Sequence, residues 1–163
     1  MSGYDIAQIC INGHCTNSDS EKYPQFNQNY CEKCGETTIT KCQECNTPIR
    51  GNYHYDGIVS CESYTPPDFC YHCGKSFPWL SKKMKATVEL AQLEEVLTEE
   101  ESAQFSEYVT DISKNTPSSQ VSAKKIAIML KKFRQSAALE IRALLVEIAS
   151  ESIKKILKDP SPF

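Results

Sequence analysis

The chain has 163 residues, enough for one ordinary domain or two small ones, and its 40% hydrophobic and 24% charged residues are typical of a globular protein. No apolar run reaches the roughly eighteen residues that predict a membrane span. The N-terminus lacks the basic and apolar regions of a signal peptide. Nine cysteines without such a signal predict a reducing cytoplasm, and metal ligation rather than disulfides.

Charge is divided unevenly along the chain. Residues 1–80 carry five Lys and Arg against nine Asp and Glu, whereas residues 81–163 carry thirteen against twelve. Bound zinc would make the first half more acidic, because four thiolates and one Zn(II) keep a net negative charge. An acidic surface is a poor match for a phosphate backbone, so nucleic-acid binding by the first half is disfavoured.

The first candidate ligands follow a short predicted strand over residues 4–10, which contains Ile6 and Ile9. Cys10 and His14 flank the turn-prone tripeptide at 11–13, and we favour them as the first ligand pair. Cys10 with Cys15 is the alternative pair.

Three Cys-x-x-Cys knuckles come next. Two intervening residues let one tight turn present both sulfurs to one ion, and each knuckle is followed by glycine or asparagine, which tolerate positive φ. Two facing pairs form a closed tetrahedral site, so the four pairs of the chain predict two Zn(II) ions. Sequential pairing is favoured over an interleaved cross-brace, because neighbouring pairs each close one loop that hairpins can fill. The knuckles are Cys31 with Cys34, Cys42 with Cys45, and Cys70 with Cys73.

Four further cysteine and histidine residues are not assigned to zinc. Cys61 has no partner at knuckle spacing and is expected to be a small buried thiol, and Cys15 is left over if His14 is the ligand. His54 lies on a predicted strand and is expected on the sheet surface, whereas His72 sits inside its knuckle and is expected to point outward.

Short strands are predicted between the knuckles, over residues 36–41 and 48–55, with a hairpin turn at 56–57. Little conventional core is present in this half, so the zinc ions are expected to hold it together. Exposed tyrosines near these strands would make good contacts for a protein partner, or would simply cover a small domain; they are Tyr53, Tyr55, Tyr64 and Tyr71.

The second half has helical periodicity and no cysteine, and predicts four helices. The first, over about 81–97, places Ala86, Leu90, Leu93 and Leu97 on one face. Thr98 opens the second with a capping box, and Pro117 opens the third. The last helix is predicted over about 137–157. Buried stripes are predicted at Phe105, Tyr108, Val109 and Ile112, at Ser122, Ile126, Met129, Leu130 and Phe133, and at Ile141, Leu145, Ile148 and Ile156.

An aromatic pair lies where the two halves meet. Phe77 and Trp79 flank Pro78, and such a pair is suited to burial, with Trp79 either capping the helical core or wedging the two halves into one rigid unit.

The order of these motifs resembles a bacterial family of unknown function, described as a double zinc ribbon followed by helices (domain of unknown function 2321). Residues 9–14, 30–35, 39–45, 48–51, 69–74 and 77–79 carry the resemblance. It implies no activity. Cys15 is not part of the family pattern, which favours His14 as ligand. The resemblance implies two zinc ions held by Cys10, His14, Cys31, Cys34, Cys42, Cys45, Cys70 and Cys73.

Together these patterns predict an α+β protein with a double zinc ribbon at 1–78 and an all-α four-helix domain at 79–163. We expect a cytoplasmic, non-enzymatic interaction or regulatory module that presents the ribbon to a protein partner, with homodimerisation through the helices as a further option. The main alternative is a nucleic-acid-binding regulator that uses the basic third helix. A thiol- or metal-dependent enzyme is a weaker alternative, because both zinc sites are filled and no phosphate loop or nucleophile elbow is present. The basic residues are Lys124, Lys125, Lys131, Lys132 and Arg134.

Overall fold

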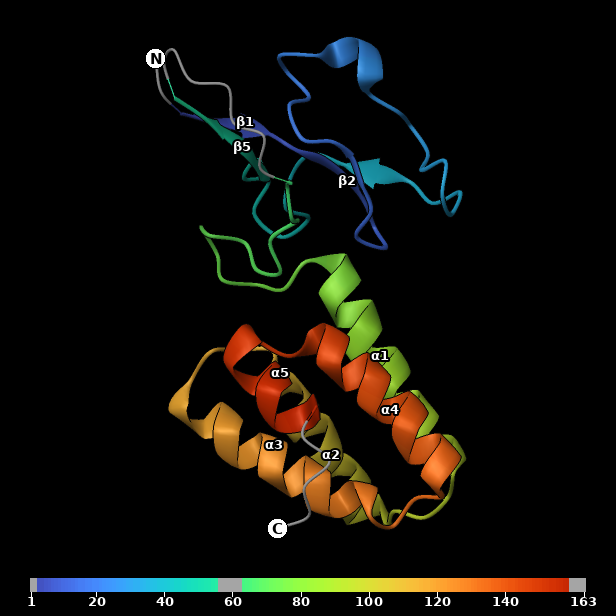
Figure 1. The fold of residues 1–163 in the computed structure, drawn as a ribbon. Helices are drawn as coiled ribbons and strands as arrows, with labels where there is room; N and C mark the ends of the chain where they lie inside the picture. The colour runs from blue at the N-terminus through green and yellow to red at the C-terminus, as the bar shows by residue number, and fades with distance from the viewer. Residues whose placement is uncertain (1–2, 56–62, 159–163) are drawn as a thin grey trace. The chain divides into compact units, whose positions relative to one another are not determined.

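The structure, a computed structural model, describes residues 3–55 and 63–158 (Figure 1). Contacts within the chain divide it into two compact units, residues 1–81 and 82–163. The first is β-rich and the second is helical, which confirms the predicted α+β class. The hairpin turn expected at 56–57 and Cys61 lie outside the described residues.

Two small antiparallel sheets form the first unit. The single strand predicted over residues 4–10 is two strands, β1 and β2, because the chain changes partner at Ala7, whose amide donates to the carbonyl of Ile49 at 2.9 Å. As a result β1 pairs with β5, whereas β2 lies between β3 and β4. A short 3-10 helix covers Pro24–Phe26. The strands are β1 (Gly3–Ile6), β2 (Gln8–Cys10), β3 (Cys15–Asn17), β4 (Thr38–Ile39) and β5 (Arg50–His54).

One close backbone approach holds the turn after β3 against β5. A Cβ atom at Gly51 would lie 2.0 Å from the carbonyl oxygen of Ser18, so only glycine fits there. The amide of Asn52 also donates to that oxygen, at 3.2 Å. Residues 18–20 are therefore fixed beside β5, although they lie more than thirty positions away in sequence.

Five helices lie in the described residues from Pro78 onward, one more than predicted, and the first turn of the first helix belongs to the first unit (Figure 1). The predicted capping box at Thr98 is present, with its side chain accepting from the amide of Glu101. Pro117 opens its helix as predicted. Within the second unit α3 packs on α2 and on α5, and α5 also packs on α4. The helices are α1 (Pro78–Leu93), α2 (Glu99–Ile112), α3 (Pro117–Leu130), α4 (Gln135–Ile148) and α5 (Glu151–Lys158).

The predicted last helix is broken at Ala149 and Ser150. Ala149 has extended backbone, with ψ of 145°, and the amide of Ser150 donates to the carbonyl of Ile112 at 3.1 Å. The carbonyl of Ser150 then accepts from the amides of Ile153 and Lys154, which starts α5. A contact with α2 thus replaces the helical hydrogen bonds that the apolar pattern alone would favour.

The prediction of which face of α1 is buried is also wrong. Leu93 is 77% exposed and Ala86 is exposed, whereas Thr87 and Ala91 are buried. The buried Leu80 at the start of the helix sets a different phase, in which Leu80, Thr87 and Ala91 share a face at i, i+7 and i+11. The other predicted stripes hold with two exceptions, Tyr108 and Ile156, which are half-buried. Their remaining members are buried: Phe105, Val109, Ile112, Ser122, Ile126, Met129, Leu130, Phe133, Ile141, Leu145 and Ile148.

Candidate metal centres

The three Cys-x-x-Cys knuckles share one backbone conformation. In each, the amide of the first cysteine donates to the carbonyl five residues later, and the amide four residues on donates back to the first cysteine, at 2.7–2.9 Å. The residue after the second cysteine has positive φ, which points the turn amides toward the sulfurs: Gly35 at 73°, Asn46 at 59° and Gly74 at 71°. The first cysteines are Cys31, Cys42 and Cys70.

The turn that carries Cys10 and His14 is tighter. The amide of Cys10 donates to the carbonyl of His14 at 2.9 Å, and the amide of Gly13, with φ of 89°, donates to the carbonyl of Cys10 at 2.8 Å. A Cβ atom at Gly13 would lie 3.0 Å from Cβ of Trp79, so this turn packs directly on the indole. The turn directs the His14 ring and the Cys10 sulfur to the same point.

The first cluster combines the Cys10 turn with the first knuckle. Cys10 Sγ lies 3.8 Å from Cys34 Sγ and 3.4 Å from His14 Nδ1, and Cys31 Sγ lies 3.6 Å from the same ring nitrogen. Cys15, the alternative partner, belongs to neither thiol cluster among the described residues. It is half-buried, and burial raises the pKa of its thiol.

The second cluster combines the second and third knuckles. Cys42 Sγ lies 3.8 Å from Cys73 Sγ, and Cys45 Sγ lies 3.7 Å from Cys70 Sγ. Neighbouring ligand pairs therefore meet, in the sequential arrangement rather than a cross-brace. His72 lies on the exposed side of its knuckle and is not part of the cluster.

The spacings distinguish metal ligation from disulfides. A disulfide requires sulfurs about 2.05 Å apart, so none of these cysteines is bridged. Four sulfurs placed tetrahedrally at about 2.3 Å from an ion lie about 3.8 Å from one another, and a ring nitrogen lies about 3.6 Å from such a sulfur. The observed sulfur–sulfur distances of 3.7–3.8 Å and sulfur–nitrogen distances of 3.4–3.6 Å match these values, so each cluster fits one four-coordinate metal ion.

The protonation of the thiols is consistent with this fit. A backbone hydrogen bond from Glu36 lowers the pKa of Cys34 to about 6, and the hydrogen bond with the Thr47 side chain lowers that of Cys45 to about 6. The amide of Lys75 acts in the same direction on Cys73, but burial and the neighbouring thiols outweigh it and raise its pKa to about 12. Thiols this close cannot all ionise by themselves, whereas a divalent cation would remove that conflict.

A tyrosine surface lies on the first unit and consists of Tyr4, Tyr53, Tyr55 and Tyr71 around Arg50. The rings of Tyr4 and Tyr53 meet edge to face at 4.8 Å, as do those of Tyr53 and Tyr55 at 4.7 Å. The Arg50 guanidinium lies 3.8 Å from the ring centroid of Tyr71 and 4.7 Å from that of Tyr4. All four rings are exposed, by 36–57%. Sequence reasoning missed Tyr4 and the ring-stacked position of Arg50.

Tyr64, the other tyrosine singled out in the sequence, has a structural contact. It is half-buried, and its hydroxyl donates to the carbonyl of Arg50 at 2.7 Å. Together with Tyr4, Arg50 and Tyr53 it lines a pocket of about 360 Å³ on this surface. Tyr64 therefore borders the tyrosine surface and contacts the backbone of Arg50 rather than presenting an exposed ring.

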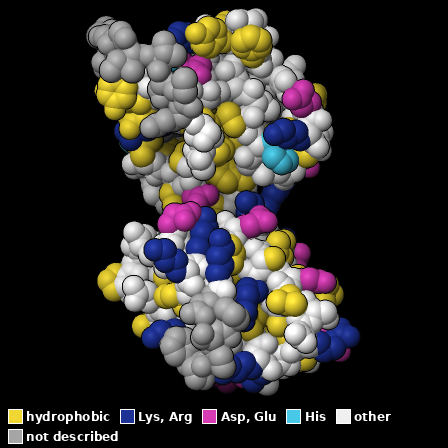
Figure 2. All heavy atoms as spheres, in the orientation of Figure 1, with side chains coloured by type: hydrophobic (Ala, Val, Ile, Leu, Met, Phe, Trp, Pro, Cys, Tyr) yellow, Lys and Arg dark blue, Asp and Glu magenta, His cyan; other side chains and the backbone are white. Residues whose placement is uncertain are grey.

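The basic residues of α3 and the loop after it are largely engaged within the helical unit. Lys132 pairs with Glu101, Arg134 pairs with Glu94 at 3.0 Å, and Lys125 lies over the ring of Tyr108 at 4.8 Å. On the face of this unit drawn in Figure 2, Lys and Arg side chains are interspersed with Asp and Glu. The basic cluster therefore does not form a purely cationic patch.

A search of curated proteins and a search of solved structures each found no match to this chain. Among the described residues, no helix combines the length and apolar character needed to cross a membrane. A family model described as "Uncharacterized protein conserved in bacteria (DUF2321)" matches residues 3–157. Because that match takes in nearly the whole chain, and the two clusters fit a double zinc ribbon, the protein belongs to the DUF2321 family of uncharacterized bacterial proteins.

Proposed function

We propose that this protein is a zinc-binding, non-enzymatic interaction module whose double zinc ribbon presents a tyrosine surface to a protein partner. The observation that carries the proposal is the agreement between the spacings of both clusters and the edges of a zinc tetrahedron. The ligands of the first ion are Cys10, His14, Cys31 and Cys34, and those of the second are Cys42, Cys45, Cys70 and Cys73.

Zinc is the preferred occupant because thiolates with one imidazole in tetrahedral array are its characteristic donor set. Four protein ligands at each site leave no open position for water or substrate, so both ions are structural. The only other described cysteine, Cys15, is a poor nucleophile, since burial raises its pKa and reactive thiols need a lowered one. An enzymatic role is therefore disfavoured. A thiol-rich, zinc-bearing chain suits the cytoplasm.

The partner role is supported by the tyrosine surface. Tyr4, Tyr55 and Tyr71 are each more than half exposed, and the rings are held by one another and by Arg50. Rigid amphipathic rings bury large areas at low entropic cost, which is why tyrosine and arginine dominate interface hot spots. A fixed aromatic surface over metal-held loops is well suited to such a contact.

Two measurements test the proposal. Elemental analysis of protein purified without chelator should give two zinc ions per chain, and one ion or none would overturn the metal assignment. In pull-downs, the double variant Tyr53→Ser, Tyr71→Ser should lose a partner that the wild type retains. Tyr30→Ser is the matched control, because Tyr30 is 64% exposed but lies outside the tyrosine surface. Equal loss by both variants would reject this surface as the contact.

Nucleic-acid binding through α3 is the second candidate, favoured by Lys124 on this helix and Lys131 just after it. Against it stand the engaged Lys125, Lys132 and Arg134 and the acidic first half. If it holds, affinity for DNA or RNA should fall steeply with salt and fall further in Lys124→Ala, Lys131→Ala. Homodimerisation through the helices is tested by sedimentation of the same samples.

A further inference from the structure

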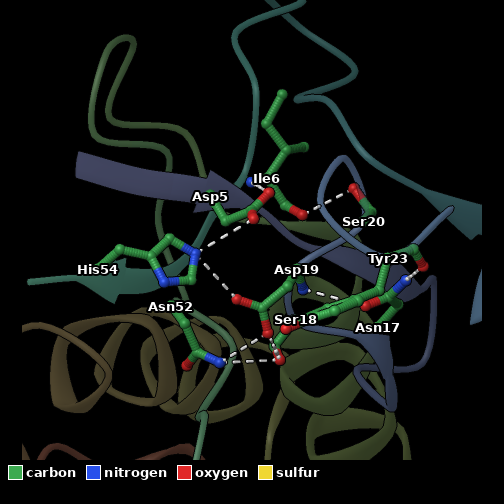
Figure 3. A network of polar contacts seen from close by, with 9 residues as sticks. All are labelled: Asp5, Ile6, Asn17, Ser18, Asp19, Ser20, Tyr23, Asn52 and His54. Carbon is green, nitrogen blue, oxygen red and sulfur yellow. Dashed lines mark hydrogen bonds and ion pairs between the residues drawn. The ribbon is translucent and has the colours of Figure 1, made fainter. Parts of the chain in front are cut away.

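A third group of potential ligand atoms lies in the first unit and shares no residue with either thiol cluster. Figure 3 shows its three side chains. Nε2 of His54, on β5, lies 3.2 Å from Oδ2 of Asp5, on β1, and 3.2 Å from Oδ1 of Asp19, in the turn after β3. Three segments far apart in the sequence therefore direct one nitrogen and two oxygens to a single point, in the same way as each thiol cluster gathers its ligands.

Both carboxylates are shielded from water. The side chain of Asp5 is 7% exposed and that of Asp19 is 14% exposed, whereas the ring of His54 is 36% exposed. Burial of two carboxylates side by side is costly unless a cation lies between them. Among the described residues, no Lys or Arg forms an ion pair with either carboxylate, and within this part of the chain His54 is the one side chain that could place a positive charge between them.

The outer oxygen of each carboxylate is already occupied by donors. Asp5 Oδ1 accepts from the amide of Ile6 at 2.7 Å. Asp19 Oδ2 accepts from the hydroxyl of Ser18 at 2.7 Å and from the amide group of Asn52 at 2.9 Å (Figure 3). These bonds fix both groups as acceptors and orient their remaining oxygens toward His54.

A proton on Nε2 of His54 can serve only one of the two carboxylates. Nε2 lies within hydrogen-bonding distance of Asp5 Oδ2, at 3.2 Å. One N–H carries one hydrogen, which can be aligned with one oxygen only, and charge-assisted bonds of this kind are about 2.7–2.9 Å long. The two oxygens are instead equidistant at 3.2 Å. Nitrogen and oxygen ligands at about 2.0–2.1 Å from a tetrahedral ion lie about 3.3–3.4 Å from one another, which is close to the observed spacing.

We propose that Asp5, Asp19 and His54 form a third metal site, which takes a divalent transition-metal ion such as Zn(II) through one imidazole nitrogen and two carboxylate oxygens. This donor set is harder than that of the thiolate sites, and it selects the same class of divalent ion with lower affinity. Three protein ligands leave the remaining position of the ion to water. The ion joins β1, β5 and the turn after β3, which hold few other large buried side chains.

The test uses the full chain with both thiolate sites loaded with zinc. One further equivalent of Zn(II) should bind in calorimetry. In ¹H–¹⁵N spectra of the histidine rings it should shift the Nε2 resonance of His54. His72, exposed in its knuckle, is an internal reference in the same spectrum and should not respond. If the His54 nitrogens do not respond to Zn(II), the group is an ion pair of an imidazolium with two carboxylates and the proposal is wrong.

A matched pair of variants tests whether the Asp19 carboxylate binds the third metal ion. Asp19→Asn keeps an oxygen for the Ser18 and Asn52 hydrogen bonds but removes the charge. It should lower the affinity for the third Zn(II) ion by at least about tenfold, because even the loss of an outer-shell partner has an effect of that size. Glu21→Gln removes an exposed charge nearby and should leave binding unchanged. Elemental analysis showing two retained zinc ions verifies that each variant is folded. Equal third-ion affinity in wild type and Asp19→Asn would overturn the site.

Discussion

The two units of this protein reach a stable fold by different physical means. In the helical unit, large apolar side chains such as Phe105, Ile126 and Ile141 are completely buried, so removal of hydrocarbon from water supplies most of the stabilisation. In the first unit, four of the buried side chains are the thiols of Cys10, Cys31, Cys42 and Cys70. Its strands are two to five residues long, too short to be stable alone.

This contrast means that the two units respond to different conditions. With zinc bound as proposed, the first unit would depend on free zinc and on ionised thiols, whereas a hydrophobic core depends on neither. Perturbing the metal, a ligand, the core or a helix cap separately distinguishes these dependences, and metal removal should affect the first unit while sparing the second.

Metal removal should have the largest effect. Chelation with excess EDTA should unfold the first unit, because its ligand-bearing loops lose their common centre, while the helical circular-dichroism signal largely survives. Trp79 reports on the first unit, since its ring stacks on Phe77 at 4.6 Å and its Nε1 donates to the carbonyl of Pro67 at 3.1 Å. Its fluorescence should therefore shift on chelation. An unchanged emission spectrum after complete zinc loss would contradict this dependence.

Loss of one ligand should have a smaller but still large effect. His14→Ala leaves three thiolates at the first site and should release one of two zinc ions, because its Nδ1 contacts the sulfurs of both Cys10 and Cys31. Cys15→Ala is the control and should retain both ions. Elemental analysis and thiol titration after gel filtration measure the outcome. Zinc loss in the Cys15 variant alone would reverse the ligand assignment.

A core truncation should affect only the helical unit. Phe105 is fully buried, so Phe105→Ala should lower the free energy of unfolding by about 3–5 kcal/mol through lost burial and a residual cavity. Urea unfolding followed by helical circular dichroism measures this. The zinc content should remain two per chain, and a parallel loss of metal would mean that the units are not separable in this way.

The capping box of α2 should contribute less. Thr98→Ala removes the hydroxyl that accepts from the amide of Glu101, and should cost about 1 kcal/mol. Thr110→Ala is the comparison within the same helix, because its hydroxyl only donates back to the carbonyl of Ser106. Equal costs for the two substitutions in urea unfolding would show that the cap contributes nothing specific.

The smallest effect concerns pH. The hydrogen bond from Lys132 lowers the pKa of Glu101 below its ordinary value of 4.5, so the pair stabilises the folded helical unit above that pH. The contribution is lost as the pH falls through the lowered pKa. Lys132→Met should therefore lower stability at pH 7 and flatten its decline on acidification. If the free energy of unfolding depends on pH in the same way in wild type and variant, the Glu101–Lys132 pair does not contribute to stability.

Local patterns predicted more of this molecule than long-range ones. The knuckles at Cys31, Cys42 and Cys70 follow from short spacing and a residue that accepts positive φ, and the capping box at Thr98 depends on four consecutive residues. The break after α4 depends on a hydrogen bond from Ser150 to Ile112, thirty-eight positions away, which no apolar periodicity contains.

The group at His54 escaped prediction for the same reason. Asp5, Asp19 and His54 have no fixed spacing, and they meet only because β1 pairs with β5 and because Gly51 admits the backbone of Ser18. The face of α1 was mispredicted because its apolar residues occupy two phases, and burial of Leu80 decides between them.

The sequential arrangement of the two thiol clusters has a consequence for synthesis on the ribosome. The first and last ligands of the first cluster lie 24 positions apart and those of the second lie 31 positions apart, and the two ranges do not overlap. The first ligand set is thus complete once Cys34 has left the exit tunnel, before any residue of the second set is needed. An interleaved pairing, first with third and second with fourth, would instead leave the first set incomplete until Cys45 had been made, when thiols of both sets are already present. The two ligand sets of the nascent chain are therefore completed one at a time, from the N-terminus onward.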